Sequence, residues 1–353
     1  MADSSPPYRE VRYELSRDFL RILEHLQASL LISTYQAGKL VAVGCVQGEL
    51  KLSFHNFEQA MGIAIGGERI AVGARGQIWF LHNVSELAHT SAGGQPADAC
   101  FVARRSLVTG NIHGHELAWA GEQLWVVNTL FSCLCTLHEE YSFVPRWQPP
   151  FIKELAAEDR CHLNGLGMAH GKPAIVTVMA ESNTPAGWRP TKATSGCVLD
   201  FPSGETIARG LAMPHSPRLH DGKLWVLDSG TGRLATIDRS TGKVQTVCAM
   251  PAYTRGLAFG GQFAFVGMSK IRETAVFGGV PIAENRANLK CGIAVVDLLS
   301  GQAVAYLQFL SGVDEIFDVQ VLPRVRFPCI SGPFPQQDDA QDIWIVPPAG
   351  KLP

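Results

Sequence analysis

Three histidines stand at one offset in a recurring sequence pattern, and histidine is a common ligand of catalytic transition metals. His113, His162 and His215 each lie four residues before a leucine that opens a strand-like segment. Imidazole nitrogens bind Fe, Mn, Cu and Zn, whereas Ca²⁺ takes mostly oxygen ligands. Three protein nitrogens leave positions open for water or substrate. The spacing therefore predicts a three-histidine metal site, with Fe or Cu preferred and Mn or Zn as further candidates.

Other copies of the pattern carry polar side chains at the same offset, namely Gln59, Tyr253 and Glu315. We expect Glu315 or Gln59 to be a fourth ligand or general base, and Tyr253 to join the catalytic group. His115 and Asn164 lie two residues nearer their leucines and are predicted to contact substrate or to support the ligands. The alternative interpretation is that all of these side chains simply line a polar channel.

Two long segments between predicted strands contain more lysine and arginine than glutamate. They are Glu181 to Gly196, which includes Arg189, and Ser269 to Lys290, which includes Arg272. If both cover the predicted metal site, their charge favours an anionic ligand such as a carboxylate. Arg189 and Arg272 are therefore predicted to bind substrate, although both segments are equally consistent with solvated surface loops.

The elements that must position these residues are copies of a short repeat. Each copy is a strand, a turn with glycine or a similar residue, and a second apolar strand, as in Glu116–Val127 and Gly256–Val266. The copies recur at intervals of roughly 40 to 60 residues, which is typical of four-stranded propeller blades. Six such copies predict an all-β, six-bladed β-propeller.

The chain ends are predicted to close the ring. Leu30–Tyr35, Lys39–Gly44 and Glu49–Phe54 have no first strand of their own, so they should complete the last blade beside the strand near Val319. Closure of this kind removes exposed sheet edges. We expect residues 1–28 to be an arm with a short amphipathic helix, and residues 29–353 to be one propeller domain. Residues 343–346 are predicted to be a further strand with no assigned place.

Composition excludes several functional classes. The 353 residues are 46% hydrophobic and 18% charged, with 35 Gly, 21 Pro and a formal charge of −2, so the chain should fold and should not bind nucleic acid. No apolar run reaches the roughly 20 residues that span a bilayer, and no secretion signal is visible. Nine scattered cysteines favour reduced thiols in the cytoplasm. Phosphate-binding glycine motifs are absent, so no nucleotide cofactor is expected.

The blade pattern resembles the six-bladed propellers of the gluconolactonase, strictosidine-synthase and NHL-repeat superfamily. Those lactonases hold calcium with Glu, Asn and Asp, whereas this chain offers histidines. The histidine set with Gln59 is more similar in type to the manganese site of oligogalacturonate lyases. The segments Phe54-His-Asn-Phe-Glu-Gln-Ala-Met-Gly and Asn111-Ile-His-Gly-His-Glu-Leu-Ala-Trp resemble a bacterial family of uncharacterised proteins, which supports the fold and implies no activity.

Three functions follow as hypotheses. The first is a metal-dependent enzyme that oxidises a small anionic substrate, or one that bears a carboxylate, in the manner of an oxygenase or hydroxylase. The second is a metal-dependent lyase or hydrolase at the same site, acting on a small molecule or peptide. The third is a propeller that binds a partner without catalysis. No membrane or nucleic-acid partner is predicted for any of them.

Overall fold

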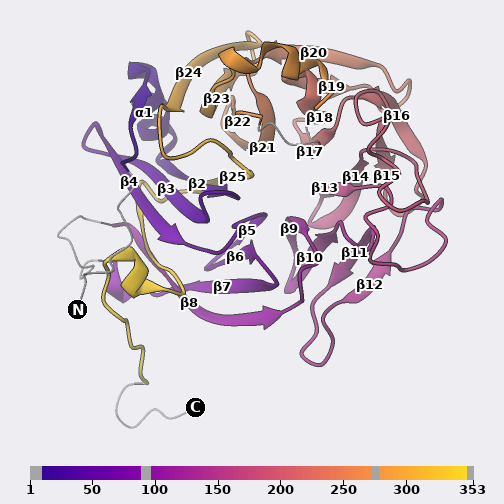
Figure 1. Cartoon of the computed structure of the whole chain (residues 1–353). Coiled ribbons are helices and arrows are strands. Elements are labelled where there is room, and N and C mark those ends of the chain that lie inside the picture. Colours follow the sequence, from indigo (N-terminus) through magenta and orange to yellow (C-terminus); the bar gives the residue numbers. More distant parts are fainter. Residues whose placement is uncertain (1–9, 89–96, 272–277, 348–353) are drawn as a thin grey trace, which may run out of the picture.

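Short strands joined by tight turns build six sheets, which stand around a central axis (Figure 1). The structure is a computed structural model and describes residues 10–88, 97–271 and 278–347. β-Structure dominates because apolar residues alternate with polar ones or form short buried runs between turns. The predicted all-β, six-bladed β-propeller is thus confirmed.

The first three blades follow one another along the chain. Blade 1 contains β5 (Ile63–Gly66), β6 (Arg69–Ala74), β7 (Gln77–Asn83) and β8 (Ala99–Val108). Blade 2 contains β9 (Gly114–Ala120), β10 (Gln123–Asn128), β11 (Cys133–Thr136) and β12 (Val144–Trp147). Blade 3 contains β13 (Leu163–Ala169), β14 (Lys172–Val178), β15 (Gly196–Asp200) and β16 (Thr206–Leu211).

The remaining blades complete the circle. Blade 4 contains β17 (Pro214–His220), β18 (Lys223–Asp228), β19 (Arg233–Ile237) and β20 (Val244–Ala249). Blade 5 contains β21 (Tyr253–Gly260), β22 (Phe263–Ser269), β23 (Cys291–Asp297) and β24 (Gln302–Phe309). Blade 6 contains β25 (Asp318–Pro323), β2 (Ala28–Thr34), β3 (Lys39–Val46) and β4 (Glu49–Asn56).

Blade 6 joins the two ends of the chain, as predicted. Its innermost strand β25 pairs antiparallel with β2, and Leu31 lies opposite Gln320. The buried Ser33 hydroxyl donates a hydrogen bond to the Met61 carbonyl of blade 1 and accepts one from the Asp318 N–H. This contact ties the closing blade to the first one, so every blade has a neighbour on both sides.

Two blades differ from the four-stranded prediction because a fifth strand covers their outer edge. In blade 5, β1 (Tyr13–Leu15) pairs with β24. In blade 1, β26 (Pro328–Ser331) runs parallel to β8. The predicted strand at residues 343–346 is wrong, since this segment has no strand pairing. Its apolar alternation is real: Ile343 and Ile345 pack on the protein while Trp344 is 80% exposed, but β26 already occupies the nearby sheet edge.

The N-terminal helix is confirmed as α1 (Arg17–Leu26), outside the ring (Figure 1). Phe19, Ile22 and Leu23 form its buried face. They join the core between blades 5 and 6, because residues three and four apart share one side of a helix. The helix ends at Gln27, which has a φ of 48°, and the chain turns there into β2.

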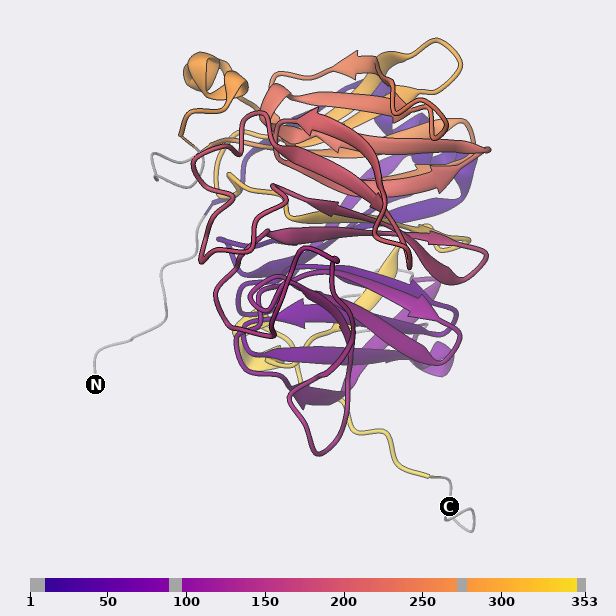
Figure 2. The same cartoon turned by 90° about the vertical axis from the view of Figure 1, so that its right-hand side faces the viewer.

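Side chains fill the spaces between neighbouring blades, and the largest core cluster lies between blades 5 and 6. Short 3₁₀ turns are found at η1 (Ser85–Leu87), η2 (Ser229–Thr231), η3 (Pro281–Asn288) and η4 (Pro335–Asp338). Long connections, including η3, gather on one face of the ring (Figure 2). Within the described ranges, none of the helices has the length and apolar character to cross a membrane.

Candidate functional site

The pairing of strands corrects the predicted equivalence of the three histidines. In blade 2, Gly114 pairs with Asn128, the last residue of β10. In blade 4, Pro214 pairs with Asp228, the last residue of β18. His115 and His215, each one residue further on, are therefore structural equivalents. The count from Leu219 was wrong because this leucine lies two positions further along its strand than Leu117 does in blade 2.

Backbone geometry gives the same assignment. His113 and His162 have φ angles of 52° and 50°, and Met213 in blade 4 has 52°. Gln59 in blade 1 has a φ of 51°. These residues share a left-handed conformation just before the inner strand of blades 1 to 4, which is unusual for side chains other than glycine. His113 thus corresponds to Met213, while His215 belongs to the next inward position.

That inward position forms what we call the axial ring, with one residue from each blade. Each member lies two residues before the position that Leu117 occupies in blade 2. The bulges in β9, β17 and β21 turn the members of these three blades toward the axis. The members are Met61, His115, Asn164, His215, Arg255 and Phe317. Five of them line a cavity of about 10 Å³, which has room for about one water molecule: His115, Asn164, His215, Arg255 and Phe317.

His115 and His215 are held in the same way. His115 Nδ1 lies 3.0 Å from the His113 carbonyl oxygen and 2.7 Å from Thr129 Oγ1. His215 Nδ1 lies 2.9 Å from both the Met213 carbonyl oxygen and Ser229 Oγ. A carbonyl only accepts, so Nδ1 carries the proton and Nε2 keeps a lone pair.

Burial keeps both imidazoles neutral. Burial, then the nearby His162 and Arg255, lowers the pKa of His115 well below its usual 6.5. Burial, then Arg255 and His162, does the same to the pKa of His215. Desolvation disfavours the cationic form, and a neighbouring guanidinium adds repulsion. Both rings therefore present neutral Nε2 atoms near neutral pH.

His162 has a carboxylate partner. Its Nδ1 lies 2.9 Å from each carboxyl oxygen of Asp159, and Trp188 Nε1 donates to Asp159 Oδ2 at 3.1 Å. The His162 ring also lies 4.3 Å from the Trp188 ring and 4.8 Å from the His115 ring, centroid to centroid. Asp159 thus orients His162 and leaves its Nε2 as a base, the arrangement that general-base catalysis uses.

A positive charge stands across the ring. Arg255 is 5% exposed, and its guanidinium lies 3.8 Å from the centre of the Phe317 ring. Its Nη1 donates to Glu315 Oε1 at 3.2 Å, while its buried Nε has no hydrogen-bond partner among the residues that the structure describes. A buried, partly unsatisfied guanidinium favours an anion that accepts from it.

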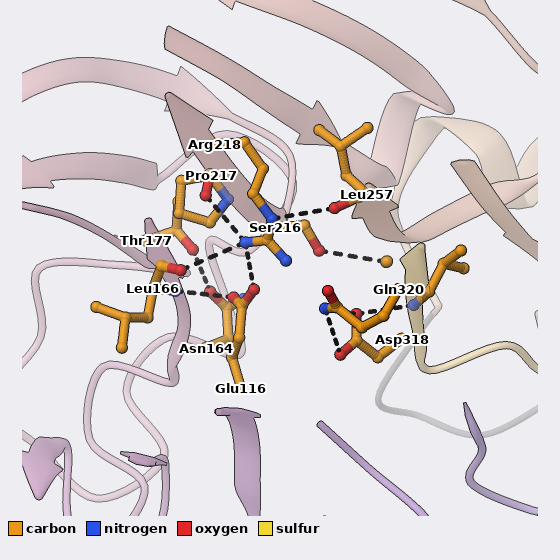
Figure 3. Close-up of polar contacts among 12 residues, drawn as sticks. Glu116, Asn164, Leu166, Thr177, Ser216, Pro217, Arg218, Leu257, Asp318 and Gln320 are labelled. Carbon is orange, nitrogen blue, oxygen red and sulfur yellow. Dashed lines mark hydrogen bonds and ion pairs between the residues drawn. The ribbon is translucent and has the colours of Figure 1, made fainter. Parts of the chain in front are cut away.

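A belt of polar side chains, which includes Glu116, Ser216, Arg218 and Asp318, comes from the inner strands just after the axial ring in sequence (Figure 3). Glu116 forms an ion pair with Arg218 and accepts from the Leu166 N–H at 2.8 Å. Asp318 accepts from the Ile63 N–H at 2.8 Å, and Ser216 accepts from the Gly256 N–H at 3.2 Å. Each of these acceptors binds an N–H of the next blade, so these hydrogen bonds hold neighbouring blades together.

The belt holds two acids with perturbed pKa values. Burial raises the pKa of Glu116 to about 7, against the opposing effect of Arg218. Burial likewise raises the pKa of Asp318. Arg218 also donates to the carbonyl oxygens of Leu166, Pro217 and Leu257, so it fastens three neighbouring blades together.

The structure brings most of the predicted site residues together. His113, His115, His162, Asn164 and His215 lie in or beside the axial ring, and the pKa of His113 is lowered by burial. The Tyr253 ring lies 5.8 Å from the His215 ring, and burial raises its pKa. Glu315 reaches the ring through Arg255. Asn164 donates to the Pro214 carbonyl oxygen and accepts from Thr177, so both of its amide atoms have structural partners.

The remaining predicted residues lie further out. The Gln59 side chain forms no hydrogen bond with any part of the chain that the structure describes. Arg189 is exposed and lies over Trp188, 5.5 Å from the ring centre. Arg272 lies outside the described residues. The basic segment 181–196 contributes Trp188, and Lys192 is 8% exposed, so this segment is packed rather than freely solvated.

The donors of the predicted metal site have suitable chemistry, but they are not gathered as a set. Within residues 10–88, 97–271 and 278–347, no three His, Cys, Asp or Glu side chains stand together in an arrangement that could hold a metal ion. The oxygen partners of Nδ1 on His115, His162 and His215 are nevertheless of the kind that support metal-binding imidazoles.

Sequence reasoning missed Asp159, Trp188, Arg255 and Phe317. Arg255 and Phe317 carry a usable signal, since each lies two residues before its anchor, as His115 and Asn164 do. Asp159 and Trp188 lie in connections between strands, where spacing in the repeat does not predict the position of a side chain. Only the path of these connections brings Trp188 to Asp159 and Asp159 to His162.

Comparison with solved structures supports the architecture. A nidogen/laminin complex contains a chain that matches 84% of this chain and 99% of its own, with a TM-score of 0.53 and 10% identity. A protein of unknown function from Bacteroides caccae matches 84% of this chain and 98% of its own, with a TM-score of 0.52 and 9% identity. Identities this low show a shared fold alone.

No curated protein matches the sequence. A family model described as a domain of unknown function, DUF4915, matches residues 17–331, from the start of α1 to the end of β26. This match includes all six blades and every residue of the axial ring. The chain therefore belongs to the DUF4915 family.

Proposed function

We propose that this protein is an enzyme of the lyase or hydrolase type, which moves a proton on a small anionic substrate above the axial ring. The observation that carries the proposal is the Asp159–His162 pair, with Nδ1 fixed at 2.9 Å from both carboxyl oxygens. Trp188 holds Asp159 from the other side. A base fixed this way needs no reorganisation when it accepts a proton at Nε2.

The neighbouring groups suit an anion that is being deprotonated or hydrolysed. Arg255 supplies a buried positive charge with an Nε that lacks a partner. His115 and His215 stay neutral because burial lowers their pKa values, so they accept hydrogen bonds without adding charge. The cavity inside the ring, about 10 Å³, is too small for a substrate. Substrate must therefore lie on the outer side, where His162 and His113 are only half-buried.

Hydrogen exchange tests the proposal whatever product is formed. The protein is incubated in D₂O with a mixture of small hydroxy acids, lactones and uronates, and NMR follows loss of carbon-bound protons and new products. Wild-type protein should change at least one component, and His162→Gln should be at least about 100-fold slower. His170→Gln, at an exposed histidine, is the matched control. Equal rates in wild type and His162→Gln would contradict the assignment of the base.

A second candidate is the metal-dependent oxidation of the same class of substrate, with Fe or Cu preferred over Mn or Zn. It is favoured by one observation, that Nδ1 of His115, His162 and His215 is bound by oxygen while Nε2 is left for a ligand. In this structure the three rings do not form a group that could hold a metal, so this candidate requires them to move closer together. A metal held there would supply dioxygen activation, and Arg255 would orient the anionic substrate. Its histidine set differs from the sequence prediction by exchanging His113 for His115.

Metal analysis separates the two candidates. Protein purified without chelators, and after reconstitution with each metal, is compared with the His115→Ala, His162→Ala and His215→Ala variants. Bound Fe or Cu with oxygen uptake, lost in all three variants, supports oxidation. Turnover in D₂O by protein that contains no metal supports the first candidate. If the protein binds no metal and shows no turnover, the result supports a propeller that binds a partner without catalysis.

A further inference from the structure

A second group of chemically capable side chains lies far from the axial ring, on the outer strand β4. Ser53 Oγ lies 2.9 Å from His55 Nε2, and His55 Nδ1 lies 3.7 Å from Asp338 Oδ2. Serine, histidine and aspartate thus stand in the order of a nucleophile, a general base and the carboxylate that orients the base. We propose that these residues form a serine esterase site for small apolar acyl esters.

The strand explains why two of the three groups meet. Side chains two residues apart on a strand point to the same face, so Ser53 and His55 lie side by side along β4. Asp338 comes from η4, and Asn56 fixes it there through its N–H, which donates to Asp338 Oδ1 at 2.9 Å. The aspartate therefore comes from a C-terminal segment, and a tertiary contact with β4 positions it beside the histidine.

Asp338 has an unused acceptor that points to the histidine. Its side chain is 3% exposed, and its buried Oδ2 has no hydrogen-bond partner within the described part of the chain. A buried carboxylate oxygen without a donor is costly unless a donor moves to it. His55 Nδ1 is the group within reach, and a shift of less than about 1 Å would complete the hydrogen bond. Catalytic hydrogen bonds are often long before substrate binds.

The three side chains line a cavity with a volume of about 750 Å³. This size suits a small ligand, since ligand sites occupy roughly 300 to 1,000 Å³. Leu87, Phe327 and Ile330 give the cavity apolar walls. A short aliphatic or aromatic acyl group would fit such walls, and the ester carbonyl would reach Ser53.

A backbone donor for the developing oxyanion lies next to the nucleophile. In the β3–β4 ladder, the Asn56 N–H points away from β3 and donates to Asp338. Backbone N–H groups two residues apart on a strand point to the same side, so the Phe54 N–H also points to this open edge. Serine hydrolases of unrelated folds use the N–H that follows the nucleophile for this purpose. Phe54 also borders the cavity.

The reaction balances without a cofactor. Ser53 Oγ attacks the ester carbonyl carbon while His55 Nε2 takes the hydroxyl proton. The C–O bond to the alcohol breaks, and His55 returns the proton to the leaving oxygen. Water then attacks the acyl-serine, again losing its proton to His55, and the carboxylic acid leaves as Ser53 Oγ regains a proton. Asp338 holds the imidazolium throughout.

Labelling with a fluorophosphonate tests the site, because only an activated serine displaces fluoride from phosphorus. Intact mass and peptide mapping should place one label on Ser53 of the folded wild type, and Ser53→Ala should abolish it. Ser331→Ala is the matched control, because Ser331 borders the same cavity without a histidine partner, and it should label like wild type. Absence of a label, or a label on another residue, would overturn the proposal.

The supporting residues have their own readout. Asp338→Asn should slow labelling and p-nitrophenyl butyrate hydrolysis by at least about tenfold, through a lower kcat more than a higher KM. His162→Gln should keep full labelling, which separates this site from the axial one. Equal labelling rates for Asp338→Asn and wild type would refute the role of the carboxylate.

Discussion

Replacing Glu116 with glutamine measures what a buried acid does inside the propeller channel. Burial raises the pKa of Glu116 from 4.5 to about 7 even though Arg218 lies beside it. The folded state therefore holds the proton more tightly than the unfolded state, and wild-type stability should fall as pH rises from about 4.5 to 7. A difference of about 2.5 units at about 1.4 kcal/mol each gives roughly 3 kcal/mol.

Glutamine retains an oxygen that can accept from the Leu166 N–H but cannot titrate. The Glu116→Gln variant should therefore gain about 3 kcal/mol relative to wild type between pH 4.5 and 8, whatever its stability at the lower pH. Urea unfolding of both proteins across this range gives the difference directly, and the slopes from other groups cancel. Glu122→Gln, at a side chain 91% exposed, is the control and should show little change.

The sign of the result decides between two physical effects. If Glu116→Gln loses stability relative to wild type as pH rises, the attraction of Arg218 outweighs desolvation and the folded pKa lies below 4.5. The inference that the folded protein holds a neutral or weakly ionised carboxyl would then be wrong. Breaking a buried ion pair typically costs about 3–5 kcal/mol, so the two outcomes are well separated.

Three other predictions concern single positions, two near the site and one in the N-terminal helix. Gly267→Ala would place a Cβ against the Arg255 carbonyl oxygen, well inside van der Waals contact. The free energy of unfolding in urea should therefore fall by at least about 2 kcal/mol. An unchanged free energy would show that the axial ring shifts freely. Phe19→Ala removes a fully buried side chain from the inner face of α1, so the free energy of unfolding should fall by about 3–5 kcal/mol. A fall of less than about 1 kcal/mol would mean that the helix does not unfold together with the core. The pKa of His215 lies well below 6.5 in the folded state, so the unfolded chain binds that proton first and stability should fall as pH drops below about 6.5; urea unfolding of His215→Gln should lack this part of the slope, and an unchanged slope would contradict it.

The fold was predictable because each blade repeats the same local rules. Apolar alternation marks strands, glycine turns separate them, and copies at similar spacing must bury their faces against one another. The closure of blade 6 was also predictable. Residues 28–56 form three strands without an inner strand from the same part of the chain, so the inner strand had to come from near the C-terminus, as β25 does. The fifth strands β1 and β26 escaped prediction because a three- or four-residue edge strand has no periodicity of its own.

The candidate site was predictable as a neighbourhood but not as a geometry. Position in the repeat predicted that His113, His162 and His215 converge on the axis, with His115 and Asn164 as contacts beside them, whereas the structure places His115, Asn164 and His215 in the axial ring. The count was wrong by two residues in blade 4, because apolar residues occur at alternate positions and either Pro217 or Leu219 could serve as the reference. A shift of two keeps a residue on the same face of a strand, so nothing in the local pattern exposes the error.

By itself, the sequence determined the all-β repeat, the six blades, the closed ring and the gathering of histidines at the inner strands, since all of these follow from periodicity and from the need to bury apolar faces. Only the tertiary structure decided which side chains meet. The contact of Asp159 with His162 depends on the path of a connection, that of Arg255 with Phe317 on the join between two blades, and that of Asp338 with His55 on where the end of the chain returns. Such contacts are set by distances between segments far apart in the chain, which local propensity does not encode.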